Sequence, residues 1–305
     1  MEYKRLEVYT WWKCNHKCVF CIEYPVMEKY WDKEITEREM MKKLIKYRKE
    51  WFNHVTFLWG EPFVHKVLLF ATLFARKIWY TVMVTTNASM VQYEKNAEKQ
   101  LPSIDQLIIS IPIIDWEKQL IINRTKGLIN FDNVFKNIQK YWNWNFLKIN
   151  TVINRLNLES IVNIIEYVWK KWVKEMSITY PDIVMPYYSK KFVISNIAPS
   201  YKELLPHMDK WFDMAKEYNI NLILTDVPFC MLSKLEYYKK TDDFVYQART
   251  KINAIEETLD RTKILPRRRK TLFKCRKCIY KNTCWWPSIH YRELYWTWEI
   301  KAITK

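Results

Sequence analysis

The stretch Leu6-Glu7-Val8-Tyr9-Thr10, followed closely by Cys14-Asn15-His16-Lys17-Cys18-Val19-Phe20-Cys21, decides how the rest of the chain can be arranged. The first five residues are mostly apolar or β-branched and predict a β-strand. Three cysteines then follow with the spacing C-x3-C-x2-C. Thiolates ligate iron–sulfur clusters, and three of them leave one iron of a four-iron cluster without a protein ligand. An open metal position is typical of a site that binds substrate, whereas a closed one only stabilises a fold.

Length and composition indicate a folded protein with a sizeable core, because 49% of the 305 residues are hydrophobic. No apolar run reaches the ~18 residues of a membrane span. The first residues, Met1 to Arg5, lack the apolar segment of a secretory signal. The 7 cysteines are clustered, which fits metal ligation in a reducing compartment better than a disulfide scaffold. We therefore expect a cytoplasmic protein without a membrane partner.

The formal net charge of +17 favours anionic partners through long-range attraction. The densest basic patch is Arg267-Arg268-Arg269-Lys270, followed by Lys274, Arg276 and Lys277. It could contact nucleic acid, an acidic peptide or the carboxylates of a cofactor. The simpler interpretation is a lysine-rich, solvated surface that reflects a biased composition.

Glycine is scarce and tryptophan abundant, with 2 glycines and 16 tryptophans. A chain of this length normally has roughly 21 glycines, and turns need the positive φ that glycine adopts freely. The pairs Trp11-Trp12 and Trp285-Trp286 each flank a cysteine, and Trp296 and Trp298 crowd a terminal turn. Our hypothesis is that a codon read as glycine by the organism has been translated here as tryptophan. The alternative is a protein that is truly rich in tryptophan.

Strands and helices are predicted to alternate from the N-terminus to residue 180. The expected strands are Leu6–Thr10, His54–Leu58, Tyr80–Thr86, Leu107–Ile111, Leu147–Ile153 and Lys174–Tyr180. The expected helices are Glu37–Glu50, with Thr36 as N-cap and Glu39 three residues later, Val67–Lys77, Gln92–Gln100, Phe131–Tyr141 and Leu158–Trp169. This alternation predicts a parallel sheet with right-handed crossovers, in which function gathers at the C-terminal ends of the strands.

The alternation loosens from Pro181 onward. Ser200–Tyr218 reads as one more helix and Ile220–Val227 as a strand-like run, and the remainder is irregular, basic and cysteine-bearing. We therefore predict an α/β fold, a partial (β/α)6 TIM-like barrel with parallel strands, plus a small irregular cysteine-bearing C-terminal domain. The expected domains are residues 1–220 and 221–305.

The cysteine motif, with the aromatic Phe20 before its last cysteine, resembles that of the radical S-adenosylmethionine (radical SAM) superfamily. The resemblance implies a [4Fe-4S] cluster ligated by Cys14, Cys18 and Cys21, with S-adenosylmethionine chelating the open iron. It also implies an external electron donor of the ferredoxin or flavodoxin type. One electron then cleaves S-adenosylmethionine to a 5′-deoxyadenosyl radical, which abstracts hydrogen from a substrate. A closed zinc site is the alternative, but His16 is poorly placed to complete it.

Two further segments resemble motifs of the same family. Trp59-Gly60-Glu61-Pro62 resembles its Gly-Gly-Glu-Pro turn, which binds the methionine amino group, and a carboxylate suits an ammonium. Thr85-Thr86-Asn87 resembles its Thr-Asn-Gly segment near the ribose, with Ala88 in place of the glycine. Ser110, and Asn154 or Asn157, occupy places where the family contacts ribose or carboxylate, although capping and turn formation explain them equally well. The expected cofactor-binding residues are Gly60, Glu61, Pro62, Thr86, Asn87, Ser110 and Asn154.

The remaining cysteines form a second group, Cys230 and then Cys275-x2-Cys278-x5-Cys284. Four thiolates suffice to close a cluster completely. The spacing, and the tail from Cys284 to Glu299, resemble the SPASM or twitch auxiliary-cluster domain, with too few cysteines for two auxiliary clusters. The resemblance implies one further [4Fe-4S] cluster, which would also pin down the tail. Zinc is the alternative ion for a site of four cysteines.

Three functions remain open from the sequence. The first is a radical SAM enzyme that acts on a peptide or protein side chain, or on a small molecule. The second is a radical SAM enzyme that modifies RNA or a nucleotide, which the positive charge favours, although no RNA-binding signature is present. The third is a non-catalytic zinc and nucleic-acid-binding protein.

Overall fold

The computed structural model describes residues 4–9, 13–21, 34–125, 127–142, 146–182, 189–233, 251–253, 258–260, 272–282, 284, 287–295 and 297–304. Thr10, Trp11-Trp12, Arg267–Lys270, Trp285-Trp286 and Trp296 lie outside the described residues. The chain divides into two compact units. Unit 1 comprises Met1–Ser110, Ile114–Lys148 and Gln247–Thr262, and unit 2 comprises Ile111–Ile113, Ile149–Tyr246 and Lys263–Lys305.

Unit 1 is built on parallel strands that pair in register. These are β1 (Arg5–Tyr9), β2 (His54–Leu58), β3 (Thr81–Thr86) and β4 (Gln106–Ser110), and their order is β4-β3-β2-β1. Val8 pairs with Phe57, which pairs with Val84, and all three side chains are buried. Because the strands run parallel, their C-terminal ends meet at one edge of the sheet, as the sequence predicts.

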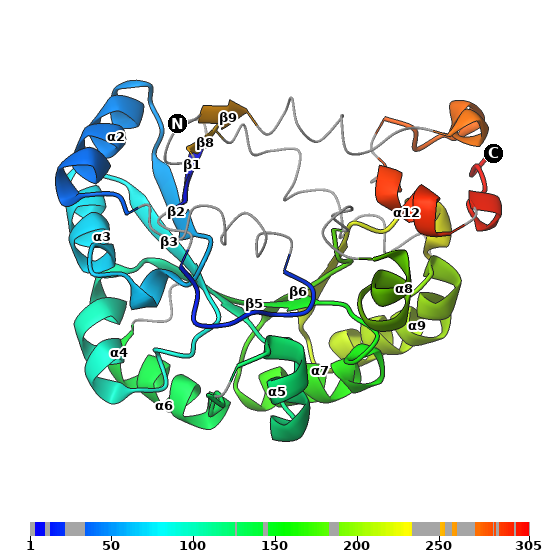
Figure 1. Cartoon of the computed structure of the whole chain (residues 1–305), viewed down its shortest axis with the longest axis horizontal. Coiled ribbons are helices and arrows are strands. Elements are labelled where there is room, and N and C mark those ends of the chain that lie inside the picture. Colours follow the sequence, from blue (N-terminus) through cyan, green and yellow to red (C-terminus); the bar gives the residue numbers. More distant parts are fainter. Residues whose placement is uncertain are drawn as a thin grey trace. The chain divides into compact units, whose positions relative to one another are not determined.

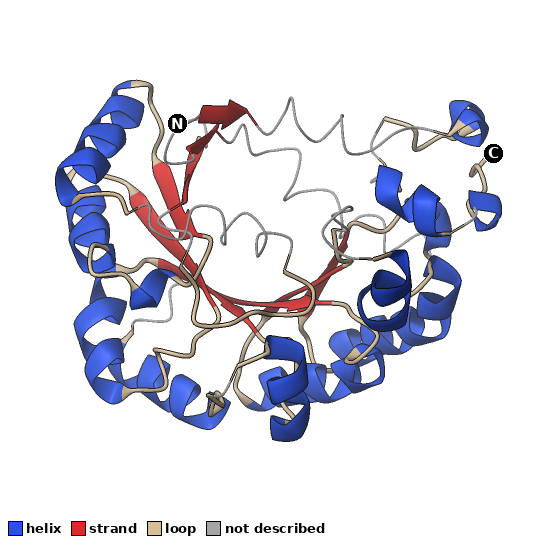
Figure 2. Cartoon of the chain, in the orientation of Figure 1, coloured by secondary structure: helices blue, strands red, loops and turns tan. Residues whose placement is uncertain are grey.

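Helices cover one face of these strands (Figures 1 and 2). The helices of unit 1 are α2 (Glu37–Lys49), α3 (Leu68–Lys77), α4 (Glu94–Gln100), α5 (Trp116–Asn123) and α6 (Phe131–Tyr141), with 3-10 turns η1 (Pro62–Val64) and η2 (Leu101–Ser103). Helix α2 begins at the predicted capping box. The Thr36 side chain accepts from the backbone N–H of Glu39, and the Glu39 carboxylate accepts from the backbone N–H of Thr36. These bonds satisfy donors that a helix start leaves open.

Among the described residues of unit 1, one helix and two strands were not predicted. Helix α5 follows β4, and strands β8 (Lys251–Asn253) and β9 (Thr258–Asp260) extend the sheet beyond β1, with β8 parallel to β1 and β9 antiparallel to β8. Each is short, and short elements give too few residues for a periodic pattern. The predicted domain boundary near residue 220 stays a prediction.

Unit 2 repeats the strand–helix alternation. It contains Ile149–Val152 of β5 (Leu147–Val152), then β6 (Glu175–Thr179) and β7 (Asn221–Thr225), which pair in parallel. Its helices and turns are η3 (Leu158–Ser160), α7 (Ile161–Lys170), α8 (Lys190–Phe192), η4 (Val193–Ile197), α9 (Tyr201–Glu217), η5 (Phe229–Met231), η7 (Phe273–Lys277), α12 (Ile289–Leu294) and η8 (Thr297–Glu299). No helix within the described ranges is long and apolar enough to cross a membrane.

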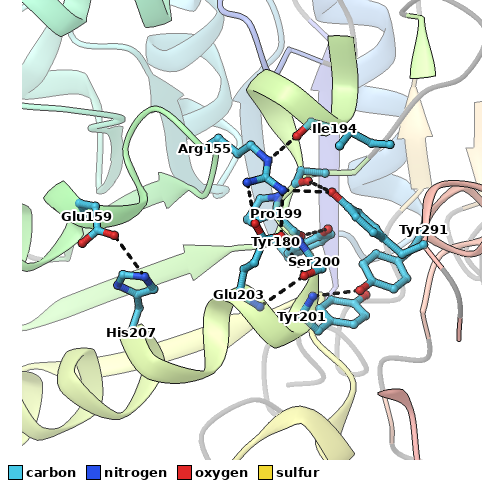
Figure 3. Close-up of polar contacts among 12 residues, drawn as sticks. Arg155, Glu159, Tyr180, Ile194, Pro199, Ser200, Tyr201, Glu203, His207 and Tyr291 are labelled. Carbon is cyan, nitrogen blue, oxygen red and sulfur yellow. Dashed lines mark hydrogen bonds and ion pairs between the residues drawn. The ribbon is translucent and has the colours of Figure 1, made fainter. Parts of the chain in front are cut away.

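Tyrosines join the C-terminal segment to the start of α9 (Figure 3). The Tyr291 hydroxyl accepts from the backbone N–H of Tyr201 at 2.9 Å and donates to the carboxylate of Glu299. The rings of Tyr201 and Tyr291 stack with centroids 4.0 Å apart. Arg155 holds Glu203, in the first turn of α9, through two hydrogen bonds of 2.6 and 2.8 Å. These contacts hold the tail against α9 within unit 2.

Tryptophans occupy backbone positions that usually belong to glycine. Trp51, Trp79 and Trp172 follow the C-caps of α2, α3 and α7, with φ of 67°, 68° and 63°. The equivalent residue after α9 is Asn219, with φ of 52°. Trp59, after β2, has φ of 76°. A side chain in this left-handed region costs energy that glycine does not incur.

Candidate metal centre

The loop that carries Cys14, Cys18 and Cys21 is held against the end of α5. The backbone N–H of Lys17 donates to the carbonyl of Asn123, and that of Val19 to the carbonyl of Ile122, both at 2.9 Å. A turn within the loop is closed by the N–H of Cys21 and the carbonyl of Cys18 at 3.0 Å. These bonds fix the backbone from which the thiols project.

The three thiols are partly buried and repel one another as thiolates. Burial first, and then the charges of Glu61 and Cys21, raise the pKa of the Cys14 thiol to about 12. Burial also raises the pKa of Cys18 well above its usual range, with added repulsion from Cys21 and Cys14. The thiols are therefore close enough for their charges to interact. Bound cations would offset both the burial and the repulsion, so this donor set fits a positively charged metal group.

Among the residues that the structure describes, no three His, Cys, Asp or Glu side chains lie close enough together to hold a single metal ion. This geometry is compatible with a four-iron cluster, because each thiolate binds a different iron atom. His16 is buried, and burial lowers its pKa to about 4, so the ring is neutral.

Glu61 joins the ends of β2 and β3. Its side chain is fully buried, and its Oε1 accepts from the Thr86 hydroxyl at 2.6 Å and from the backbone N–H of Phe63 at 3.1 Å. Its Oε2 accepts from the backbone N–H of Asn87 at 2.7 Å. Burial raises the pKa of this carboxyl to about 7, and the three hydrogen bonds oppose the rise. The predicted contact with an amino group stays a prediction, while the observed contacts brace the loop.

The turn before Glu61 is also attached to the cysteine loop. The backbone N–H of Glu61 donates to the carbonyl of Lys13 at 3.0 Å. Gly60 has φ of 58°, so it uses the left-handed region that favours glycine, and Pro62 is buried at the start of η1. The Gly60-Glu61-Pro62 segment therefore lies beside the start of the cysteine loop.

Asn87, just after β3, reaches the cysteine loop. Its Nδ2 donates to Oδ1 of Asn15 at 3.0 Å and lies 3.9 Å from Sγ of Cys14. The Nδ2 of Asn15 donates in turn to the Ser89 hydroxyl at 2.7 Å. Ala88, which replaces the expected glycine, has φ of 62°. The structure thus brings together Cys14, Glu61, Thr86 and Asn87, all of which the sequence singled out.

Unlike Asn87, Ser110 and Asn154 form no side-chain hydrogen bond with the described residues of the cysteine loop. Ser110 is the half-buried last residue of β4 in unit 1. Asn154 is buried in unit 2, where its Oδ1 accepts from the backbone N–H groups of Leu156 and Asn157. The buried Asn157 donates to the carbonyl of Pro112 at 2.8 Å. These asparagines build the turn after β5, and their cofactor contacts stay predictions.

Sequence reasoning missed Asn15, Ser89 and Asn123. Asn15 lies inside the recognised motif, where only the cysteines were interpreted. Asn123 ends a helix that the sequence did not predict, and the Asp115 N-cap that starts this helix was the available signal.

The four remaining cysteines all lie in unit 2, near enough for the other three to influence the Cys230 thiol electrostatically. Burial first, and then the charges of Cys284, Cys275 and Cys278, raise the pKa of the Cys230 thiol to about 12. The Cys284 Sγ accepts from the backbone N–H of Phe229 at 3.4 Å, which joins the tail to η5. Cys230 and Cys275 are separated by 44 residues in the sequence, yet their thiols interact electrostatically. We therefore treat the four thiols as a candidate second metal group.

A family model described as the Radical SAM superfamily matches residues 10–168. An S-adenosylmethionine-dependent nucleotide dehydratase from Lacinutrix mariniflava is 28% identical over 156 residues, which cover 49% of this chain and 33% of that protein. An uncharacterised protein of Methanocaldococcus jannaschii is 33% identical over 66 residues, which cover 20% of each chain. The matches thus span a third or less of these relatives.

Solved structures with the same fold include peptide-bound proteins. Streptococcus suis SuiB bound to its precursor peptide SuiA has a TM-score of 0.58 and 15% identity, covering 73% of this chain and 49% of SuiB. The protein anSMEcpe with bound AdoMet and the Cp18Cys peptide has a TM-score of 0.55 and 18% identity, covering 72% and 62%. These likenesses confirm the predicted α/β class, an open parallel sheet of the partial-barrel type.

Proposed function

This chain belongs to the radical SAM superfamily, and from that membership we propose that it cleaves S-adenosylmethionine reductively and abstracts hydrogen from a peptide or protein side chain. One observation carries the proposal. Three partly buried thiols project from a single loop, and Asn87, which follows β3 and is held by Glu61 after β2, lies beside the first of them. Motif and geometry therefore agree on the same place in the fold.

The residues of this site have separable roles. Cys14, Cys18 and Cys21 would hold a [4Fe-4S] cluster, and Gly60, Glu61, Pro62, Thr86 and Asn87 would face S-adenosylmethionine. The bound cofactors supply one-electron chemistry that no side chain provides. Glu61 holds the backbone of Asn87, and Asn87 holds Asn15 inside the cysteine loop. This network fixes the loop before any ligand arrives, which lowers the cost of ordering the site.

A peptide substrate is supported by the printed titles of two neighbours, because SuiB binds the peptide SuiA and anSMEcpe binds the Cp18Cys peptide. The second candidate substrate is a nucleotide. One specific observation favours it, the 28% identity to a nucleotide dehydratase, and the net charge of +17 is compatible with an anionic substrate.

The test is anaerobic reconstitution with iron and sulfide, followed by dithionite and S-adenosylmethionine. We expect 5′-deoxyadenosine from the wild type and none from Cys18→Ala. Absence of 5′-deoxyadenosine from protein with intact clusters would contradict the proposal. A small precursor peptide encoded beside the gene should raise the rate of formation, whereas acceleration by ribonucleoside triphosphates alone would favour the nucleotide alternative.

We also propose that Cys230, Cys275, Cys278 and Cys284 hold a second [4Fe-4S] cluster. The observation behind it is the mutual electrostatic influence of these four thiols. A complete set of four thiolates leaves no open position, so this cluster would transfer electrons or stabilise the fold. The electron donor for the first cluster, a ferredoxin or flavodoxin, stays a prediction.

A further inference from the structure

Asn123, the last residue of α5, has a buried side-chain amide beside Cys18. The residue is 1% exposed, and its Oδ1 lies 3.7 Å from the Cys18 Sγ. Its Nδ2 is buried and has no hydrogen-bond partner among the residues the structure describes. Leaving a buried donor unsatisfied costs about 1–3 kcal/mol, so such a group in a folded protein indicates a partner that arrives later.

The backbone around Asn123 is fixed from two directions. Its carbonyl and that of Ile122 accept the N–H groups of Lys17 and Val19 in the cysteine loop. On the other side, the Gln119 amide donates to the carbonyls of Ile114 and Ile129 and accepts from the N–H of Ile129. These bonds keep the Asn123 backbone beside Cys18, and rotation of the side-chain amide can change which of its ends faces the sulfur.

The chemistry of the sulfur decides which end of the amide faces it. A neutral Cys18 thiol can donate its S–H to Oδ1, as the observed distance allows. A metal-bound thiolate has no proton and carries negative charge, so it accepts hydrogen bonds. Turning the amide by half a rotation exchanges Oδ1 and Nδ2, and the unsatisfied donor then faces the thiolate.

We propose that Nδ2 of Asn123 donates a hydrogen bond to the Cys18 thiolate in the cluster-bound protein and thereby raises the reduction potential of the cluster. The proposal rests on the proposed function, because it needs a cluster at Cys18. Hydrogen bonds to cluster sulfurs stabilise the reduced form, which carries more negative charge. Asn123 acts through Cys18 and is thus a positioning residue for the cluster.

The test is a redox titration of the reconstituted cluster, followed by electron paramagnetic resonance (EPR), in variants that also carry Cys275→Ala and Cys278→Ala so that one cluster is observed. Asn123→Leu keeps the shape of the side chain and removes the donor. We expect its midpoint to be more negative, with a roughly tenfold change in the ratio of oxidised to reduced cluster at fixed potential, or about 59 mV for one electron.

The matched control is Asn137→Leu, a buried asparagine of unit 1 that donates to the carbonyls of Val91 and Gln92. Its midpoint should equal that of the parent.

An unchanged midpoint in Asn123→Leu, at full iron content, would overturn the proposal and leave the proposed function intact. If the leucine variant does not hold the cluster, Asn123→Val removes the donor in a smaller side chain that adds no charge. A more negative midpoint in that variant supports the hydrogen bond, and a midpoint equal to that of the parent overturns it. Failure of the parent protein to assemble any cluster would instead contradict the proposed function.

The tryptophans with positive φ carry a second, independent inference. After α2, α3 and α7, the residue beyond each tryptophan donates its N–H back into the last turn, with Phe52 to Tyr47, Tyr80 to Ala75 and Val173 to Val168. This pattern is the Schellman motif, whose left-handed position is usually glycine. The indoles of Trp51, Trp79 and Trp172 are 72%, 81% and 76% exposed, so packing does not explain their presence.

Two other tryptophans, Trp142 and Trp211, are buried in the core. Trp142 is buried and its Nε1 donates to the carbonyl of Ile104 at 2.7 Å. Trp211 is buried inside α9. Backbone conformation and burial thus separate Trp51, Trp79 and Trp172, which glycine would replace without strain, from Trp142 and Trp211, which fill the core.

We infer that residues 51, 59, 79 and 172 are glycine in the protein made by the cell, because one codon is read there as glycine. A glycine at residue 59 would restore the Gly-Gly-Glu-Pro turn, whose glutamate is Glu61. Tandem mass spectrometry of peptides from the native protein tests this residue by residue. We expect glycine at these four positions and tryptophan at 142 and 211, and tryptophan at the four positions would overturn the inference.

Discussion

Glu61 couples the candidate site to the stability of unit 1. Its buried carboxyl has a pKa of about 7 instead of about 4.5, because burial disfavours the charged form more than three hydrogen bonds favour it. The folded protein therefore binds a proton that the unfolded chain releases at lower pH. This contribution to stability is present at low pH and is lost as the pH rises towards 7.

Glu61→Gln should flatten this pH dependence. Between pH 5 and pH 7, the wild type before cluster reconstitution should lose about 2 kcal/mol more unfolding free energy than the glutamine variant. Urea unfolding at both pH values measures the difference. Parallel pH profiles for the two proteins would show that Glu61 titrates normally.

Trp79→Gly should stabilise the protein by about 1 kcal/mol, because it relieves a left-handed backbone strain and loses an exposed side chain. Trp211→Gly is the contrasting control. It removes a buried indole from α9 and should destabilise by at least about 3 kcal/mol. Urea midpoints that move in the same direction for both variants would contradict the division of tryptophans by backbone conformation.

At the scale of single residues, the sequence was sufficient to identify the residues that belong to motifs with a fixed spacing. The cysteine motif and the segments around Glu61 and Asn87 lie together as expected, because each directly follows a parallel strand. Asn123 could not be found this way, because its role depends on a contact across 105 residues with Cys18.

Among the elements, α5 is the helix that holds the cysteine loop, and the sequence did not predict it. Strands β1 to β4 and most helices follow from alternating patterns and caps such as Thr36 and Glu39. Helix α5 has only eight residues and weak amphipathicity, and its buried Gln119 contradicts the usual apolar pattern. Gln119 is buried because it satisfies backbone groups of Ile114 and Ile129. Tertiary contacts of this kind are not visible in a local pattern.

Gln119→Leu should loosen α5 and the loop attached to it. The variant removes the three hydrogen bonds between the Gln119 side chain and backbone groups of Ile114 and Ile129. Each buried group that is left without a partner costs about 1–3 kcal/mol. Hydrogen exchange at the amides of Lys17 and Val19 should become faster, because their acceptors lie at the end of α5. Glu117→Ala, exposed on the same helix, is the control. Unchanged exchange in the leucine variant would show that α5 does not hold the loop.

For the whole molecule, the two cysteine groups make a stoichiometric prediction. Two [4Fe-4S] clusters require about eight irons and eight sulfides per chain, and Cys278→Ala should reduce both to about four. Iron, sulfide and zinc analysis of the reconstituted protein measures this. About four irons together with one zinc in the wild type would assign the tail site to zinc.

The most direct test of the account asks whether the cluster at Cys14, Cys18 and Cys21 has an open iron that takes up S-adenosylmethionine. The protein carrying Cys275→Ala and Cys278→Ala is reconstituted, reduced with dithionite, and examined by EPR with and without S-adenosylmethionine. We predict one [4Fe-4S]⁺ signal whose g values shift on addition of S-adenosylmethionine, because a ligand joins the open iron. A signal that S-adenosylmethionine leaves unchanged, in protein with a complete cluster, would contradict the central claim.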